Sequence, residues 1–123
     1  MGASALIVGR PGPLRDGLRA LVGSLPQIDA VAVVNDGSSL LMSGIDPAPS
    51  LVVLDADSTS DSVWRLARQA RLKWSQARII VLVGSVEEQQ EAEDAGADAV
   101  LLQGFPAGRL VTAIVKHVPQ SVL

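Results

Sequence analysis

The segment LVVLDAD (51–57) holds the side chains of this sequence that are best placed to do chemistry. Four apolar residues are followed at once by two acids, Asp55 and Asp57, spaced two residues apart. A short run this apolar is typical of a strand that is buried on both faces of a parallel sheet. Open parallel sheets bind their ligands at the carboxyl ends of the strands, where Asp55 is expected to lie. The chemistry open to Asp55 therefore depends on which charged and polar groups surround it.

Other groups with chemical potential have simpler structural explanations. The loop Gly9-Arg10-Pro11-Gly12 matches neither glycine-rich phosphate-binding pattern, and a strand-to-helix turn explains it. His117, the single histidine, is placed to interact favourably with the C-terminal dipole of the last helix. The hydroxyl side chains of residues 58–62 are typical of turns and helix caps. A small-molecule-binding protein or an enzyme is an alternative on such a fold, but no loop of the sequence supports it.

Composition and length favour one globular domain over residues 1–123, with a core of about 5–118. Apolar residues make up 48% of the chain and aromatic residues only 2%, so aliphatic side chains must fill the core. The net charge of −3 and the lack of a basic stripe argue against direct nucleic-acid binding. There is no cysteine, and we identify neither a signal peptide nor a membrane span, which favours a cytoplasmic protein.

Apolar runs alternate with helical patterns along the whole chain. Strands are expected at 5–8, 30–34, 51–54, 78–83 and 99–102. Helices are expected from Pro13 to about Leu25, over a short segment at 38–42, over a segment that carries Val63 and ends at about Trp74, from Ser85 to near Gly96, and around 110–118. The Ser85–Glu88 spacing is a capping box. Strict strand–helix alternation predicts a parallel sheet with helices on both faces, because each crossover is right-handed.

With this order of elements, the sequence resembles the receiver domains of two-component response regulators, and its pattern is similar to the NarL/LuxR type. The resemblance covers about residues 5–118. It is carried by the segments ALIVGRPGPLRDGLRALV, LVVLDAD, RIIVLVGS and AGADAVLLQG. The last segment is the most specific, because G-A-D before a short apolar strand is habitual in that family. The resemblance implies a flavodoxin-like α/β fold, a doubly wound (βα)5 three-layer sandwich with a five-stranded parallel sheet in the order 2-1-3-4-5.

In that family, an aspartate at the end of the third strand accepts a phosphoryl group from a histidine kinase, and Asp55 holds the matching position. The family also has an acidic pair after the first strand that helps to hold Mg²⁺, a Thr or Ser after the fourth and a Lys after the fifth. The matching positions here depart from this pattern. They are Gly9 and Arg10 for the acidic pair, Val83 for the hydroxyl, Gln103 for the lysine and Val100 for the switch aromatic of the fifth strand.

These departures predict that no metal is bound. Only Asp55 and Asp57 are left to hold a cation, and Asp57 lies where a backbone carbonyl usually reaches the metal. A guanidinium about 4 Å from Asp55 would attract it by about 4 kcal/mol at an effective dielectric constant near 20. We hypothesise that Arg10 pairs with Asp55 in place of Mg²⁺ and blocks phosphoryl entry. The alternative, with Arg10 pointing into solvent, is compatible with the Gly- and Pro-rich loop.

The resemblance and its departures together favour an atypical receiver, or pseudo-receiver. Such a domain would act in two-component-type signalling by protein–protein contact or dimerisation, without enzymatic activity, cofactor or Mg²⁺-dependent aspartyl phosphorylation. We expect the contact to use the face made by the helix after Ser85, the strand 99–102 and the last helix. The alternative is a conventional receiver that a histidine kinase phosphorylates on Asp55 in the presence of Mg²⁺, and that controls a DNA-binding output domain and so transcription.

Overall fold

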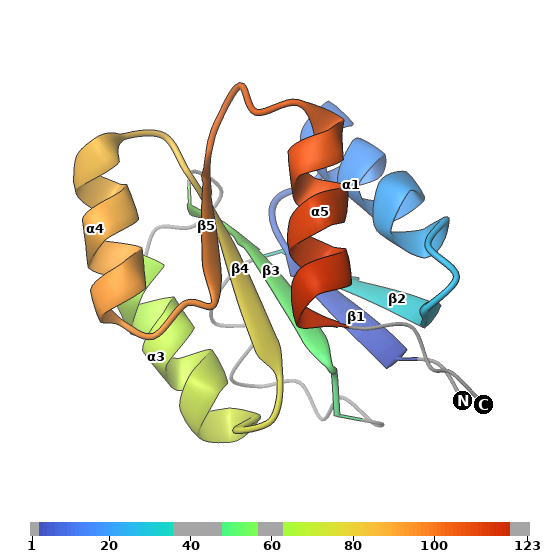
Figure 1. The fold of residues 1–123 in the computed structure, drawn as a ribbon, viewed down its shortest axis with the longest axis horizontal. Helices are drawn as coiled ribbons and strands as arrows, with labels where there is room; N and C mark the ends of the chain where they lie inside the picture. Colours follow the sequence, from blue (N-terminus) through green and yellow to red (C-terminus); the bar gives the residue numbers. More distant parts are fainter. Residues whose placement is uncertain (1–2, 36–47, 57–62, 119–123) are drawn as a thin grey trace.

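The computed structural model describes residues 3–35, 48–56 and 63–118, and shows a sheet between two layers of helices (Figure 1). All strand pairs are parallel, and the sheet order is β2-β1-β3-β4-β5. The strands are β1 (Ala3–Val8), β2 (Ile28–Val34), β3 (Leu51–Asp55), β4 (Arg78–Val83) and β5 (Ala99–Leu102). The described helices are α1 (Pro13–Gly23), α3 (Val63–Lys73), α4 (Val86–Asp94) and α5 (Ala107–His117). This architecture confirms the predicted flavodoxin-like fold and strand order.

The strand bounds follow the predicted ones closely. The bounds of β4 and β5 are as predicted, whereas β1 and β2 each begin two residues earlier, at Ala3 and Ile28. Polar residues near these starts interrupt the apolar runs, so the sequence pattern alone does not predict them. In the structure the Ala3 N–H donates a hydrogen bond to the Gln27 carbonyl at 2.7 Å. β3 extends one residue further than predicted and ends at Asp55, which is in register with Leu82 of β4. The short helix expected at 38–42 lies outside the described residues.

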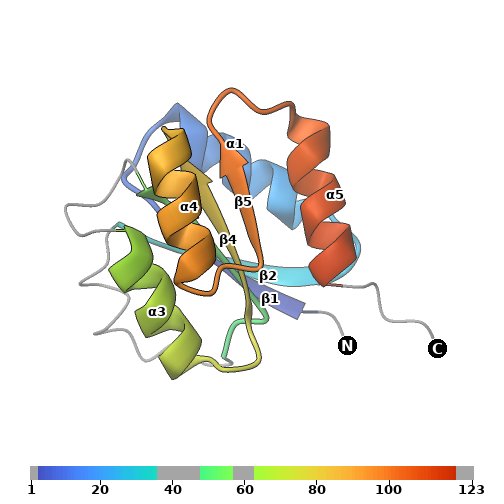
Figure 2. The same cartoon turned by 60° about the vertical axis from the view of Figure 1, so that its left-hand side comes forward.

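Each face of the sheet is covered by a pair of helices, as Figures 1 and 2 show. α1 and α5 cover one face, and α3 and α4 lie side by side on the other. Neighbouring residues of one strand point to opposite faces, so Ile7 packs under α1 and α5 while Leu6 and Val8 pack under α3 and α4. Every residue of β3 is buried. This two-sided burial explains why the strand sequence is a continuous apolar run.

Two helix starts form where the sequence predicts them, whereas α5 begins at Ala107, three residues before the predicted segment. Pro13 is the first residue of α1, where its missing N–H costs nothing. Ser85 caps α4, and its hydroxyl accepts a hydrogen bond from the Glu88 N–H at 3.2 Å. In return, the Glu88 carboxylate accepts from the Gly84 N–H at 3.1 Å, one residue before the usual partner of a capping box. These bonds fix the connection between β4 and α4.

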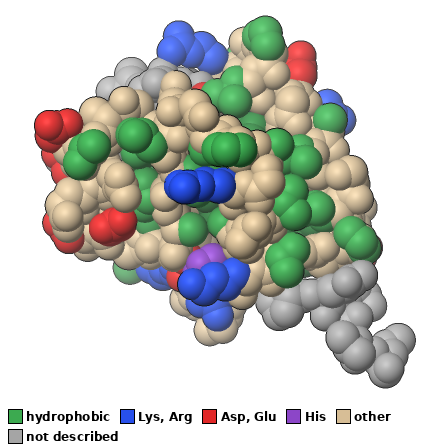
Figure 3. Space-filling model, turned by 45° about the horizontal axis from the view of Figure 1, so that its top comes forward, with side chains coloured by type: hydrophobic (Ala, Val, Ile, Leu, Met, Phe, Trp, Pro, Cys, Tyr) green, Lys and Arg blue, Asp and Glu red, His purple; other side chains and the backbone are tan. Residues whose placement is uncertain are grey.

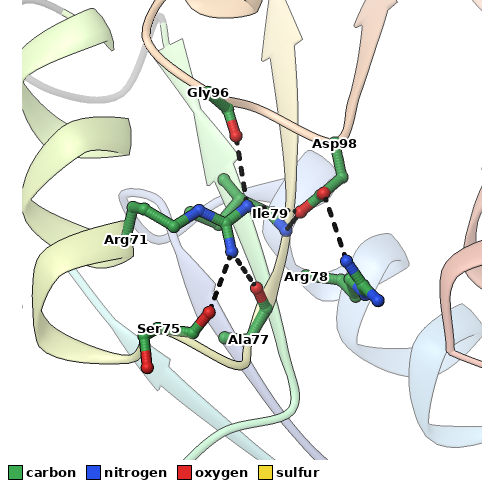
Figure 4. A network of polar contacts seen from close by, with 7 residues as sticks. All are labelled: Arg71, Ser75, Ala77, Arg78, Ile79, Gly96 and Asp98. Atoms are coloured by element: carbon green, nitrogen blue, oxygen red, sulfur yellow. Dashed lines mark hydrogen bonds and ion pairs between the residues drawn. The ribbon is translucent and has the colours of Figure 1, made fainter.

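The G-A-D motif (96–98) builds a polar network at the edge of the sheet opposite Asp55 (Figure 4). Gly96 has a φ of 102°, which favours glycine, and its carbonyl accepts from Arg71 at 3.1 Å. Asp98 Oδ2 accepts from Arg71 and from the Ile79 N–H, each at 2.7 Å. Arg78 adds an ion pair at 3.6 Å. The motif therefore ties α3 to the starts of β4 and β5.

We predict that Asp98→Ala lowers the free energy of unfolding by about 2 kcal/mol, because Arg71 and the Ile79 N–H both lose their acceptor. Urea denaturation followed by circular dichroism measures the change. The control is Asp94→Ala, which removes an exposed acid near the end of α4 and is expected to change stability by less than about 0.5 kcal/mol. Equal losses in the two variants would contradict the structural role of Asp98.

Candidate functional site

The carboxyl ends of the strands bring together most of the predicted site positions. Asp55 ends β3, Val83 ends β4, and Gly9 and Gln103 directly follow β1 and β5. The hydrogen bonding between neighbouring strands continues into the loops. The Gly9 N–H donates to the Val34 carbonyl at 3.0 Å, and the Gln103 N–H donates to the Val83 carbonyl at 2.7 Å. The parallel register therefore places these positions together at the carboxyl ends of the strands.

A shallow pocket of about 290 Å³ opens at this edge beside Asp55. It is lined by the loop and the first turn of α1 together with Asp55 and Gln103. Arg10 and Arg15 both belong to this lining, so two guanidinium groups share the pocket with one carboxylate. Asp55 is only 6% exposed, and water therefore contributes little to its solvation. The pocket is cationic where the resembled receivers carry acids.

Arg15 is a member of the pocket that the sequence analysis missed. Its guanidinium donates to the Gly9 carbonyl at 3.2 Å and to Asn35 Oδ1 at 2.7 Å. These two bonds connect α1 to the loops that follow β1 and β2. The feature of the sequence that points to Arg15 is its position in the first turn of the helix that begins at Pro13, close to Arg10 in the preceding loop. A cation there lies unfavourably near the helix N-terminus, and its two acceptors offset that cost.

The hydroxyl position of the resembled family contributes nothing to this pocket. Val83 is fully buried and packs in the cluster under α3 and α4. Ser85 is nearby in sequence, but its hydroxyl caps α4 and contacts the Glu88 carboxylate. Val100, at the switch-aromatic position, is partly buried against the same core cluster. An aliphatic side chain there fills less space than an aromatic ring and carries no hydroxyl.

The donor set of the pocket does not fit Mg²⁺. That ion prefers an octahedron of oxygen ligands that includes carboxylates. Asp55 is the one carboxylate that lines the pocket among the described residues, and the other charged groups are guanidinium cations. No group of three or more His, Cys, Asp or Glu side chains that could hold a metal is found within 3–35, 48–56 and 63–118. Asp57 lies outside the described residues.

The structure brings Arg10 and Asp55 to the same pocket, and each of them makes at least one interaction. The loop between β1 and α1 passes Asp55 closely enough for both side chains to line one hollow. The direct ion pair between them stays a prediction. Gln103, in the lysine position, is exposed and contributes a neutral amide to the wall. Among the described residues, Arg10 and Arg15 are the charged side chains that line the pocket together with Asp55.

Comparison with solved structures identifies similar folds among response regulators. A LuxR-family two-component response regulator from Aurantimonas sp. SI85-9A1 superposes with a TM-score of 0.81 and is 23% identical, over 94% of this chain and 84% of that one. A putative response regulator from Chloroflexus aurantiacus J-10-fl gives 0.82 at 17% identity, over 98% of this chain and all of the other. The receiver domain of NtrX from Brucella abortus superposes with a TM-score of 0.80 and is 20% identical, over 96% of this chain and 100% of that one.

These similarities establish that the chain has the receiver fold. The chain covers only 27% of longer NtrX chains. No protein-family model matches the sequence, and no curated protein matches it. Within the described residues, no helix is both long and apolar enough to span a bilayer.

A double-mutant cycle tests the predicted pairing of Arg10 with Asp55. We expect the effects of Arg10→Met and Asp55→Asn on the free energy of unfolding to couple by about 1 kcal/mol, because either change removes the same attraction. The variants and the double variant are compared by urea denaturation. Arg19→Met with Asp55→Asn is the control cycle, since Arg19 is an exposed cation of α1 outside the pocket lining. Additive effects in both cycles would contradict the pairing of Arg10 with Asp55.

Proposed function

We propose that this chain is an atypical receiver domain that acts in two-component-type signalling by protein–protein contact, without Mg²⁺-dependent phosphorylation of Asp55. The observation that carries the proposal is the pocket beside Asp55, which two arginines line in place of acids. Phosphoryl transfer to a carboxylate needs a cation that bridges acceptor and phosphoryl oxygens, held by further carboxylates. A fixed guanidinium neutralises Asp55 permanently and offers no exchangeable coordination site.

The rest of the pocket supports the same proposal. The hydroxyl that would contact an incoming phosphoryl group is replaced by buried Val83, and the lysine is replaced by Gln103. Each replacement removes one hydrogen-bond donor or cation from the transition state. Asp55 itself is retained as a buried carboxylate beside the loop after β1.

The face made by α4, β5 and α5, which we term the contact face, is the proposed surface for protein contact. β5 is an edge strand with one neighbour, β4, so its outer side faces away from the sheet. Three of the five exposed large hydrophobic side chains of the described residues lie on these elements. They are Val86, Leu102 and Val115. Exposed apolar side chains on an open sheet edge are typical of an interaction surface.

We predict that the protein incubated with acetyl phosphate and MgCl₂ gains no phosphoryl mass, because the pocket does not assemble a Mg²⁺ site. Intact-mass spectrometry at neutral pH makes the measurement. A conventional receiver treated in the same way is the positive control for the reagent. A gain of about 80 Da that Asp55→Asn abolishes would instead establish the conventional phosphoacceptor that the sequence left open.

Restoring an acid to the pocket tests its electrostatics directly. We expect Arg10→Asp to create Mg²⁺ binding in the millimolar range, because a second carboxylate then lines the pocket with Asp55 and one of its two cations is gone. Titration with MgCl₂, followed by the NMR amide shifts of residues 9–12 and 55, detects this gain. Arg19→Asp is the control, as it changes the net charge equally on an exposed position of α1. Saturable Mg²⁺ binding by the unaltered chain would contradict the proposal.

A further inference from the structure

An apolar groove lies between α1 and α5, at the same end of the sheet as the pocket beside Asp55. Its volume of about 390 Å³ is at the lower end of the range of small-molecule pockets, about 300–1,000 Å³. The larger apolar side chains that line it are Leu14, Leu18, Leu21, Phe105 and Leu110. Figure 3 shows apolar side chains gathered over the part of the molecule that holds α1 and α5, whereas the acids lie mainly over α4. The groove therefore suits the apolar part of a small ligand.

The cationic pocket beside Asp55 adjoins this groove. Three residues line both hollows: Pro13, Leu14 and Gln103. The pocket is lined by two guanidinium groups, those of Arg10 and Arg15, and by one carboxylate, which leaves one net positive charge. A ligand that extends from the groove into the pocket is therefore expected to carry one negative charge.

Arg15 is suited to bind the charged end of such a ligand. Both groups that accept its hydrogen bonds are neutral, so they do not compensate its charge. Both bonds are donated by Nη1, and the guanidinium has further donors on Nη2 and Nε. The planar fork of a guanidinium matches the two oxygens of a carboxylate.

Gly17 keeps the groove open. It lies inside α1, where glycine is less favourable than alanine, and it lines the groove. Beyond its own helix, a Cβ atom at this position would meet no heavy atom within 4 Å, and the φ of Gly17 is not positive. Neither packing nor backbone geometry thus requires glycine here. A larger side chain would occupy the groove, and the glycine therefore leaves space for a ligand.

We propose that the groove and the pocket together bind one small carboxylate with an unbranched apolar tail, of the medium-chain fatty-acid type. The carboxylate lies near the Arg15 guanidinium, and the tail lies against α1 and Phe105. A doubly charged phosphate would exceed the net charge of the pocket and would be repelled by Asp55. An apolar protein segment would leave the positive charge uncompensated. The inference deepens the proposed function, on which it rests, because it assigns a ligand to a pocket that carries out no phosphoryl transfer.

Isothermal titration calorimetry with sodium octanoate tests the inference on the whole chain. We expect saturable one-to-one binding with a dissociation constant of about 1 mM or lower. Sodium hexanoate should bind at least about fivefold more weakly, because each buried methylene group strengthens binding about threefold to fourfold. Octylammonium chloride has the same tail and the opposite charge, and it should bind at least about tenfold more weakly than octanoate.

Variants of Arg15 test the charged part of the site. Arg15→Met should weaken octanoate binding at least about fivefold, because the ligand loses its cation. Arg15→Lys keeps the charge and should lose no more than about threefold, which a merely structural role of the bonds made by Arg15 would not produce. Arg19→Met is the control and should change binding less than about twofold, since Arg19 is an exposed cation of α1 outside both hollows.

Filling the groove tests its apolar part. Gly17→Leu should weaken octanoate binding at least about tenfold, because the new side chain takes the place of the tail. Gly108→Leu is the control, because Gly108 is a glycine of α5 with an equally open Cβ position outside the groove. Circular dichroism of each variant confirms that it is folded.

Three results overturn the inference: no saturable octanoate binding up to about 20 mM, octylammonium binding as tight as that of octanoate, or a Gly17→Leu variant that binds like the unaltered chain. Treatment with acetyl phosphate and MgCl₂ separates the two proposals. A chain that binds octanoate and also gains a phosphoryl group on Asp55 refutes the proposed function alone. A chain that gains no phosphoryl group and binds no octanoate refutes this inference alone.

Discussion

The parallel register of β1, β3 and β4 is the constraint on which the rest of the structure depends. The three strands are buried on both faces, and shifting one of them by a single residue would turn its apolar side chains to the wrong layer. The register that packs Leu6 and Val8 on one face and Ile7 on the other also fixes where each strand ends. Gly9, Asp55 and the end of β4 must then meet at one edge. The position of the candidate site is thus a consequence of core packing.

Electrostatics decides what that edge can do. A buried carboxylate is costly unless a cation or several donors compensate it. In the resembled receivers a divalent ion can enter and leave, so the carboxylate stays available for reaction. Here the charged side chains that line the pocket together with Asp55 belong to the loop and to α1, and Arg15 is itself held by Gly9 and Asn35. An arginine side chain is part of the chain and cannot leave the pocket as a metal ion can. On the proposed function, the cations of the pocket are therefore always present.

Much of the fold could be predicted from the sequence, because its main signals are local. The bounds of β4 and β5, the start of α1 at Pro13 and the Ser85 cap follow from apolar runs and terminal residues alone. The early starts of β1 and β2 could not, since Ser4 and Asp29 are polar and only the pairing between strands extends them. Arg15 was missed for a similar reason. Its two acceptors lie 6 and 20 residues away, and no spacing rule connects them.

The connection between β4 and α4 links the pocket to the contact face, and its bonding argues against a two-state switch there. A switch needs a group that binds differently in its two states. The hydroxyl that could play this part, that of Ser85, is already engaged by Glu88, and Glu88 also holds Gly84. Val83 is fully buried in the core, and Val100 has no polar group that could respond to a phosphoryl group bound at Asp55. On the proposed function the domain receives no covalent signal, and the free energy that selects its active form comes from the partner that covers the contact face.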